Sequence, residues 1–239
     1  MITSCLAHRV RTLSAAAALG VLVLSVGSLS ARQAKATPPP EGQSIPDMMQ
    51  WYQAQPRLSQ PVFTTGAKVM IVKFTDLECP GCGLTHEAYK PVLAKYEAQF
   101  PGAVKLVAKD FPLNKDCNIA LQRTLHESAC EAAIAVRLAA GKGHANELED
   151  FFYRNQRVMT PDTVRRAASL VANVGTADFQ SGRAAAMQAI RADIELARSI
   201  DITSTPTFVF NGVRVPKVME PALFDALVAF ELRRAGVMR

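Results

Sequence analysis

Residues 74–82 read FTDLECPGC, and they continue an apolar run that begins at residue 68 as KVMIVKFT. This run is short and rich in β-branched and aromatic residues, which predicts a buried strand at 68–75. Beyond the two cysteines, apolar residues recur at helical spacing from 83 to 100, so we expect a helix there. The local order is therefore strand, Cys-x-x-Cys, helix.

The first cysteine of the motif, Cys79, falls where the strand ends and the helix begins. Unpaired backbone N–H groups and the positive end of the helix dipole favour a thiolate there, and bring a cysteine pKa to roughly 3.5–7.5. Cys82 lies about one helical turn on, close enough to close a disulfide or to attack a mixed disulfide at Cys79. We predict Cys79 as the nucleophile and Cys82 as the buried resolving thiol, with Pro80 and Gly81 between them. A structural disulfide or half of a zinc site are the alternatives.

A second strand is predicted at 103–112, and because a helix precedes it we expect it to lie parallel to the first in one βαβ unit. The segment at about 115–200 is interpreted as a helical insertion. Its predicted helices are 117–140, 145–155, 161–174 and 177–199. The predicted elements after it are strands at 207–210 and 213–216 around an Asn-Gly turn, and a final helix at about 220–235.

A threonine and a proline, Thr205 and Pro206, stand at the start of the later strand. A proline at this position can be cis, which turns the backbone of the preceding residue outward to pair with an extended substrate segment. We therefore predict that Thr205 and Pro206 bind the substrate. Taken alone, a proline here is a strand-boundary residue.

The first 36 residues resemble a secretory leader, with Arg9 and Arg11 ahead of an uncharged run at 13–30. We expect export, with cleavage before Thr37; an uncleaved membrane anchor is the alternative. Residues 37–59 are predicted to hold a proline-rich spacer and a short helix at 47–55, and residues 60–239 the folded domain. Without residues 1–36 the chain has 23 basic and 21 acidic residues, so its charge does not point to nucleic-acid binding.

Removing the leader leaves an even number of cysteines in a chain bound for an oxidising compartment. The other two, Cys117 and Cys130, are predicted to form a structural disulfide, worth about 3 kcal/mol in the chain-entropy model. The alternative is a second redox pair that relays electrons to a membrane partner. The two lack the spacing of a second zinc ligand pair, and no residue is assigned to a metal.

Five polar residues near these motifs are interpreted as solvated. They are Asp76, Glu78, Lys109, Asp110 and His126. The alternatives are that Asp76 and Glu78 repel the Cys79 thiolate or accept the proton of Cys82, and that Lys109 and Asp110 reach the active edge of the sheet.

Taken together, FTDLECPGC at 74–82, KDFPLNKDCN at 109–118, ACEAA at 129–133 and STPTFVFNG at 204–212 resemble the thioredoxin superfamily. Within it, the chain is similar to the DsbA-like group of bacterial exported thiol oxidoreductases over roughly residues 60–235. The resemblance implies an α/β thioredoxin-like fold with an inserted helical region, reversible disulfide exchange at the first motif, and a cis proline at Pro206. The implied cofactor is the protein's own Cys79–Cys82 disulfide.

Pro80-Gly81 departs from the Gly-Pro of thioredoxins and from the Pro-His of the archetypal periplasmic oxidase, which leaves the redox direction open. We expect a disulfide donor in the periplasm or another extracytoplasmic compartment that acts on cysteine-containing exported proteins. The resemblance implies a membrane partner of the DsbB or vitamin K epoxide reductase-homologue type. The alternatives are a reductase or isomerase, and a copper-binding thiol chaperone, against which the lack of a nearby His or Met cluster counts.

Overall fold

The computed structural model describes residues 37–40, 44–58, 66–216 and 218–239. The predicted leader at 1–36 and parts of the spacer lie outside these ranges. In the part of the chain that is described, no helix is long and apolar enough to cross a membrane.

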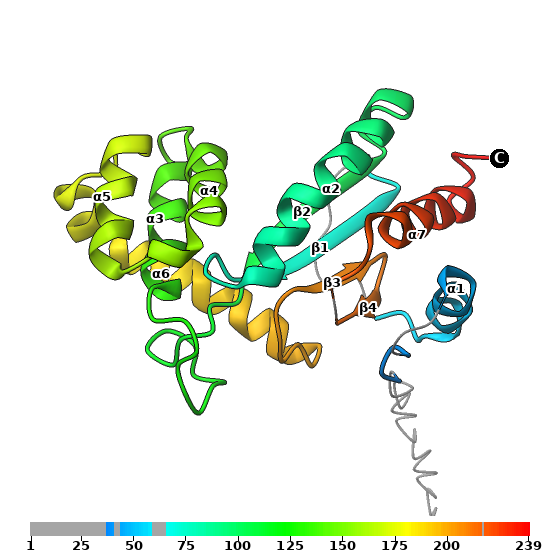
Figure 1. Cartoon of the computed structure of the whole chain (residues 1–239), viewed down its shortest axis with the longest axis horizontal. Helices are drawn as coiled ribbons and strands as arrows, with labels where there is room; N and C mark the ends of the chain where they lie inside the picture. The colour runs from blue at the N-terminus through cyan, green and yellow to red at the C-terminus, as the bar shows by residue number, and fades with distance from the viewer. Residues whose placement is uncertain (1–36, 41–43, 59–65, 217) are drawn as a thin grey trace, which may run out of the picture. The chain divides into compact units, whose positions relative to one another are not determined.

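A four-stranded sheet forms the centre of the fold, with the strand order β2-β1-β3-β4 (Figure 1). β1 runs parallel to β2, with Val69 opposite Val104, and antiparallel to β3. The strands are β1 (Val69–Thr75), β2 (Val104–Asp110), β3 (Thr207–Phe210) and β4 (Val213–Val215). The predicted strands are thus present, and β1 leads directly into the cysteine motif.

The helices follow the predicted order along the chain. They are α1 (Ile45–Ala54), α2 (Pro80–Gln99), α3 (Ala129–Ala140), α4 (Ala145–Arg154), the short 3-10 helix η1 (Gln156–Val158), α5 (Pro161–Ala172), α6 (Thr176–Ser199) and α7 (Pro221–Arg234). α3 to α6 separate β2 from β3 and form the inserted helical region (Figure 1). The α/β fold with a helical insertion is therefore confirmed.

Both faces of the sheet are covered, which explains why β1 is buried along its whole length. Successive side chains of a strand point to opposite faces. Val69 and Ile71 pack with aromatic residues of α2 and α7, whereas Met70 and Val72 pack with the inserted helices. A strand covered on both sides has no solvent-facing row, so its sequence is a continuous apolar run.

The predicted helix at 117–140 is wrong in its first half, because α3 begins only at Ala129. The asparagine side chains of this segment bond to nearby backbone groups instead. Asn114 Oδ1 accepts from the N–H of Asp116 at 2.9 Å, and Asn118 Oδ1 accepts from the N–H of Ala120 at 3.1 Å. Such local bonds compete with helical hydrogen bonds and favour turns. Residues 111–128 therefore form an irregular segment beside the cysteine motif.

The interpretation of Lys109 and Asp110 as solvated surface charges is also wrong. Lys109 Nζ contacts Asp193 Oδ1 of α6 at 2.8 Å, and Arg137 Nε of α3 contacts Asp110 Oδ2 at 2.7 Å. Arg137 also pairs with Asp193. Burial raises the pKa of Asp110 to about 6. These charges therefore join β2 to the inserted helices.

Candidate active site

Cys79 is the N-cap residue of α2, with Pro80 at the first helical position. Its side chain is only 7% exposed, and its thiol donates to the carbonyl oxygen of Thr205 at 3.5 Å. This contact joins two residues that lie far apart in the sequence. The motif at 79–82 and the segment around Thr205 therefore meet at one site.

The Thr205–Pro206 peptide bond is cis. Gly81 lies against it: a Cβ placed on Gly81 would stand 3.1 Å from Pro206 Cδ and 3.0 Å from Val218 Cγ2. The buried hydroxyl of Thr205 has no hydrogen-bond partner within the described residues. The structure thus brings together Cys79, Gly81, Thr205 and Pro206, while their roles toward a substrate remain predictions.

Cys82 is fully buried behind Cys79, and both are free thiols in this structure. Its sulfur accepts from the N–H of Asp76 at 3.5 Å. Burial raises the pKa of Cys82 well above its ordinary value. In contrast, a hydrogen bond from the Cys82 thiol lowers the pKa of Cys79 to about 6; burial opposes this shift, and the backbone N–H of Cys82 supports it. One thiol of the pair is therefore set to ionise and the other to stay protonated.

This asymmetry predicts which cysteine of the reduced protein reacts with an alkylating reagent. Because only the thiolate is nucleophilic, we expect Cys79 to be modified at neutral pH and Cys82 to be spared. The rate is expected to rise with pH to a plateau with a midpoint at about 6. Iodoacetamide labelling followed by peptide mass spectrometry measures both. Labelling of Cys82 ahead of Cys79 would contradict the assignment.

Asp76 is buried rather than solvated, so the prediction for this residue is wrong. Its Oδ2 accepts from the N–H of Leu113 at 2.6 Å and lies 2.9 Å from Nδ1 of His126. That hydrogen bond raises the pKa of His126, which is half-buried rather than exposed. Glu78, also half-buried, accepts from the N–H of Ser128 at 2.7 Å. The residues before Cys79 thus anchor the irregular segment at 111–128.

A disulfide joins Cys117 and Cys130 across this segment, so the predicted pairing is present. Both sulfurs lie against the carbonyl oxygen of Asn114, at 3.7 and 3.8 Å. The bond ties the irregular segment to the start of α3. Its structural role remains a prediction.

The inserted helices reach the site through Gln156 of η1. Its side-chain amide donates to the carbonyl oxygens of Leu77 at 2.9 Å and Cys79 at 2.8 Å. A Cβ on Gly83 would lie 2.8 Å from Gln156 Oε1, so glycine at this position leaves room for the close approach of the Gln156 side chain. Gln156 thus holds the turn on which Cys79 sits.

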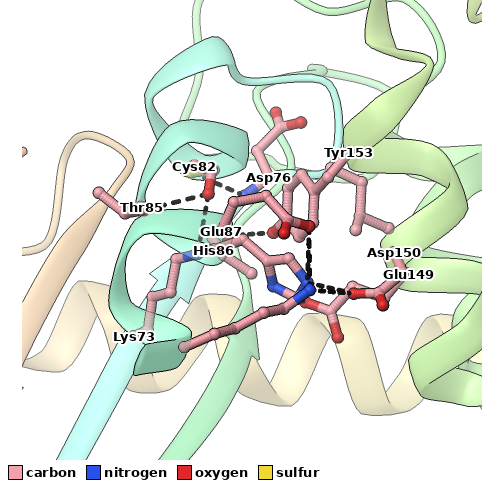
Figure 2. Close-up of polar contacts among 12 residues, drawn as sticks. Lys73, Asp76, Cys82, Thr85, His86, Glu87, Glu149, Asp150 and Tyr153 are labelled. Atoms are coloured by element: carbon pink, nitrogen blue, oxygen red, sulfur yellow. Dashed lines mark hydrogen bonds and ion pairs between the residues drawn. The ribbon is translucent and has the colours of Figure 1, made fainter. Parts of the chain in front are cut away.

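Lys73 of β1 was not predicted as a site residue, yet it is buried beneath the motif and donates from Nζ to the carbonyl oxygen of Cys82 at 3.0 Å (Figure 2). The alternation of side chains along a strand could have predicted this burial, because Lys73 follows Val69 and Ile71 on the face that α2 covers. No pattern in the sequence predicts the contacts of Asp76, His126 and Gln156, because their partners lie tens of residues away along the chain.

One group of ligand-type side chains among the described residues is close enough to hold a metal ion. It comprises His86, Glu87 and Asp150, and it includes neither active-site cysteine. Lys90 Nζ already contacts both carboxylates, at 2.9 Å each. The group is therefore an ion-pair cluster between α2 and α4.

Known proteins are similar to this chain in sequence or in fold. The curated relative Na(+)/H(+) antiporter NhaA 3 of Salinispora tropica is 27% identical over 71% of this chain, which spans only 25% of the antiporter. The oxidised BdbD structure of Bacillus subtilis is 18% identical with a TM-score of 0.57, covering 74% of this chain and 96% of that one. Wolbachia pipientis alpha-DsbA1 is also 18% identical with a TM-score of 0.57, covering 74% of this chain and 92% of that one.

The thioredoxin family model matches residues 64–229, which include the cysteine motif, the inserted helices and the cis proline. The solved structures are similar to this chain in fold. The chain therefore belongs to the thioredoxin family and has a DsbA-like fold.

Proposed function

We propose that the protein is a thiol:disulfide oxidoreductase that donates disulfides to cysteine-containing exported proteins through Cys79 and Cys82. The observation that carries this proposal is the asymmetry of the pair at the start of α2. The pKa of Cys79 is about 6, whereas that of the buried Cys82 is raised. The family match supports the same chemistry.

In the oxidising direction, a client thiolate attacks Cys79 Sγ of the enzyme disulfide, and Cys82 leaves with the electron pair of the broken S–S bond. A second client thiolate then attacks the client sulfur of the mixed disulfide and releases Cys79 as a thiolate. Two electrons pass from client to enzyme, and the client gains a disulfide. A stable Cys79 thiolate favours the last step, because a thiol of lower pKa leaves faster.

The client segment is proposed to bind at Thr205 and Pro206. The Thr205 carbonyl faces Cys79 at 3.5 Å, so an extended chain paired with Thr205 would present its cysteine to that sulfur. Val218, which is 37% exposed and lies beside Gly81, would supply an apolar contact next to this strand. These contacts depend largely on backbone, which suits an enzyme with many clients.

Reoxidation requires an electron acceptor, and we propose a membrane oxidase of the DsbB or vitamin K epoxide reductase-homologue type. The leader pattern at 1–36 supports an extracytoplasmic location, where disulfides persist.

The reduction potential tests the direction of exchange. Thioredoxin has a reduction potential of about −270 mV and a reactive cysteine with a pKa of about 7. DsbA has a reduction potential of about −120 mV and a reactive cysteine with a pKa of about 3.5. Because the pKa of Cys79 is lowered to about 6, we expect a reduction potential between these two values. Equilibration of the mature protein with glutathione buffers, read by thiol trapping, measures it.

The double variant Cys117→Ala/Cys130→Ala is measured in the same buffers. An unchanged potential is expected if that disulfide is structural, and a large change would support an electron relay. A potential at or below that of thioredoxin would make the protein a reductase and overturn the proposed direction.

A further inference from the structure

Helix α3 begins with a fully buried stretch that contains one charged residue, and the exchange described above does not use that residue. Residues 129–135 are all buried, and Glu131 is the only charged residue among them. Its side chain is 6% exposed. Burial of a carboxylate is unfavourable unless a charged group pairs with it. The ACEAA motif at 129–133 therefore requires cations from the elements that pack against α3.

Two arginines from neighbouring helices pair with Glu131. Arg165 Nε of α5 donates to its Oε1 at 2.5 Å, and Arg183 Nη1 of α6 donates to its Oε2 at 2.8 Å. Both carboxylate oxygens thus already accept from a cationic group, which leaves no negative charge in excess at Glu131. A guanidinium has five N–H donors, and each arginine donates one hydrogen bond to Glu131. The buried carboxylate therefore holds two arginines in place with donors to spare.

A cavity of about 620 Å³ opens at Glu131, where α5 and α6 both pack against α3 (Figure 1). This volume is within the range of roughly 300–1,000 Å³ that is usual for small-molecule sites. The charged residues that line the cavity are Glu131, Arg165, Arg166 and Arg183. Arginines outnumber the carboxylate three to one, so the cavity attracts anions and repels cations. It includes no residue of the active site described above.

The cavity combines guanidinium groups that can bind a ligand with an apolar wall. Arg166 is exposed, and within the described part of the chain its side chain forms no hydrogen bond or ion pair. Arg165 and Arg183, although they pair with Glu131, keep about half of their side-chain surface exposed, 51% and 47%. Val174 and Phe179 supply the apolar wall, and both are buried. The lining therefore suits a molecule that is anionic at one end and apolar at the other.

We propose that this cavity binds a small organic anion, with a carboxylate or phosphate head group on the arginines and an apolar body against Val174 and Phe179. Both head groups accept the paired hydrogen bonds that a guanidinium donates. An inorganic anion would leave most of the cavity filled with water, whereas an apolar body also removes apolar surface from water. The bound molecule would join α3, α5 and α6, and its binding does not depend on disulfide exchange.

Isothermal titration calorimetry of the full chain with octanoate and octyl phosphate tests this proposal. Octanamide, which keeps the apolar body without the charge, and inorganic phosphate, which keeps the charge without the body, are the matched probes. We expect both octyl anions to bind, and each matched probe to bind at least about tenfold more weakly, because a hydrogen bond to a charged group contributes about tenfold or more to affinity. Both octyl anions should also raise the midpoint of thermal unfolding, because they bind the folded state.

Two pairs of variants locate the ligand, and all four positions are exposed, so the substitutions should not prevent folding. Arg166→Gln should weaken binding of both octyl anions about tenfold, whereas Arg191→Gln, on α6 but outside the cavity, should leave it unchanged. Ser169→Phe should abolish binding, because the larger side chain fills the cavity. Leu170→Ser should leave binding unchanged, because Leu170 lines a neighbouring apolar groove instead.

Four results would overturn the proposal, and none of them bears on the oxidoreductase function. They are the absence of binding by both octyl anions, octanamide binding as tight as that of octanoate, equal loss in Arg166→Gln and Arg191→Gln, and binding that survives Ser169→Phe but not Leu170→Ser. The last result would mean that the ligand occupies the neighbouring groove. If the variants behave as expected, the tighter of octanoate and octyl phosphate identifies the preferred head group.

Discussion

Replacement of Cys79 by serine is expected to reduce disulfide exchange to the rate measured without enzyme. A hydroxyl group forms no disulfide, and Cys82 cannot take over because burial keeps it protonated and out of reach of a client. Oxidation of a reduced model protein with paired cysteines, followed by activity recovery and thiol trapping, measures this loss. The folded state of the variant is checked by circular dichroism.

Replacement of Cys82 by serine is expected to have a different outcome. The Cys79 thiolate still attacks a disulfide of an oxidised client and releases one client thiolate, but the mixed disulfide has no resolving thiol in the enzyme, so Cys79-linked client should accumulate as a covalent complex. Non-reducing electrophoresis detects this complex, and reductant should remove it.

The double variant Cys117→Ser/Cys130→Ser is the matched control for cysteine removal. It should keep exchange while losing about 3 kcal/mol of stability in the chain-entropy model. Loss of exchange in this control with a folded protein, or retained exchange in Cys79→Ser, would contradict the assignment of the reactive pair.

Replacement of Glu231 by alanine is expected to lower the free energy of unfolding by about 3–5 kcal/mol, the usual cost of breaking a buried ion pair. The Glu231 side chain is fully buried in α7, and Oε1 accepts from Arg57 at 2.7 Å and from the Tyr52 hydroxyl at 2.8 Å. Oε2 accepts from Asn211 at 2.9 Å and Arg234 at 3.2 Å. The carboxylate thus joins α1, the segment that follows it and the β3–β4 turn, and its loss leaves several donors without a partner.

The contribution of Glu231 to the free energy of unfolding should also depend on pH. Burial opposes ionisation of Glu231, but the hydrogen bonds from Arg57, Asn211 and Tyr52 outweigh it and lower the pKa below the ordinary value of 4.5. The group therefore stabilises the folded state fully above that value, and the stabilisation is lost as the pH falls through the folded-state pKa. The difference between wild type and Glu231→Ala should shrink accordingly in acid.

Urea unfolding followed by the fluorescence of Trp51, the single tryptophan, measures both effects. Trp51 lies on α1 and packs against the same core as α7. Glu195→Ala on α6 is a matched control, because this side chain is 59% exposed and should change stability by less than about 0.5 kcal/mol. If Glu231→Ala and Glu195→Ala lower the free energy of unfolding equally, the hydrogen bonds of buried Glu231 do not stabilise the fold more than an exposed side chain does.

Local patterns in the sequence determined much of the fold. A period of two or a continuous apolar run marks a strand, and a period of 3.6 marks a helix, so the order strand, Cys-x-x-Cys, helix, strand could be predicted from neighbouring residues alone. The Asn211-Gly212 turn was predictable for the same reason. Both residues have positive φ, 43° and 91°, which this residue pair tolerates best. The spacing of Cys79 and Cys82 likewise predicted a reactive pair there without any long-range contact.

The tertiary structure alone decided which distant groups surround that pair. Residues 117–128 have helical periodicity, yet asparagine side chains and the Cys117–Cys130 bond hold them in an irregular path that places His126 on Asp76. Lys73 resembles a strand residue in the sequence, and only the packing of α2 over β1 shows that its amine lies beneath Cys82. The physical reason is that periodicity reports on residues within a few positions, whereas the pKa of a thiol depends on charges and donors brought close by packing. The sequence by itself therefore determined the position and spacing of the two sulfurs, and the fold decided the environment that sets their chemistry.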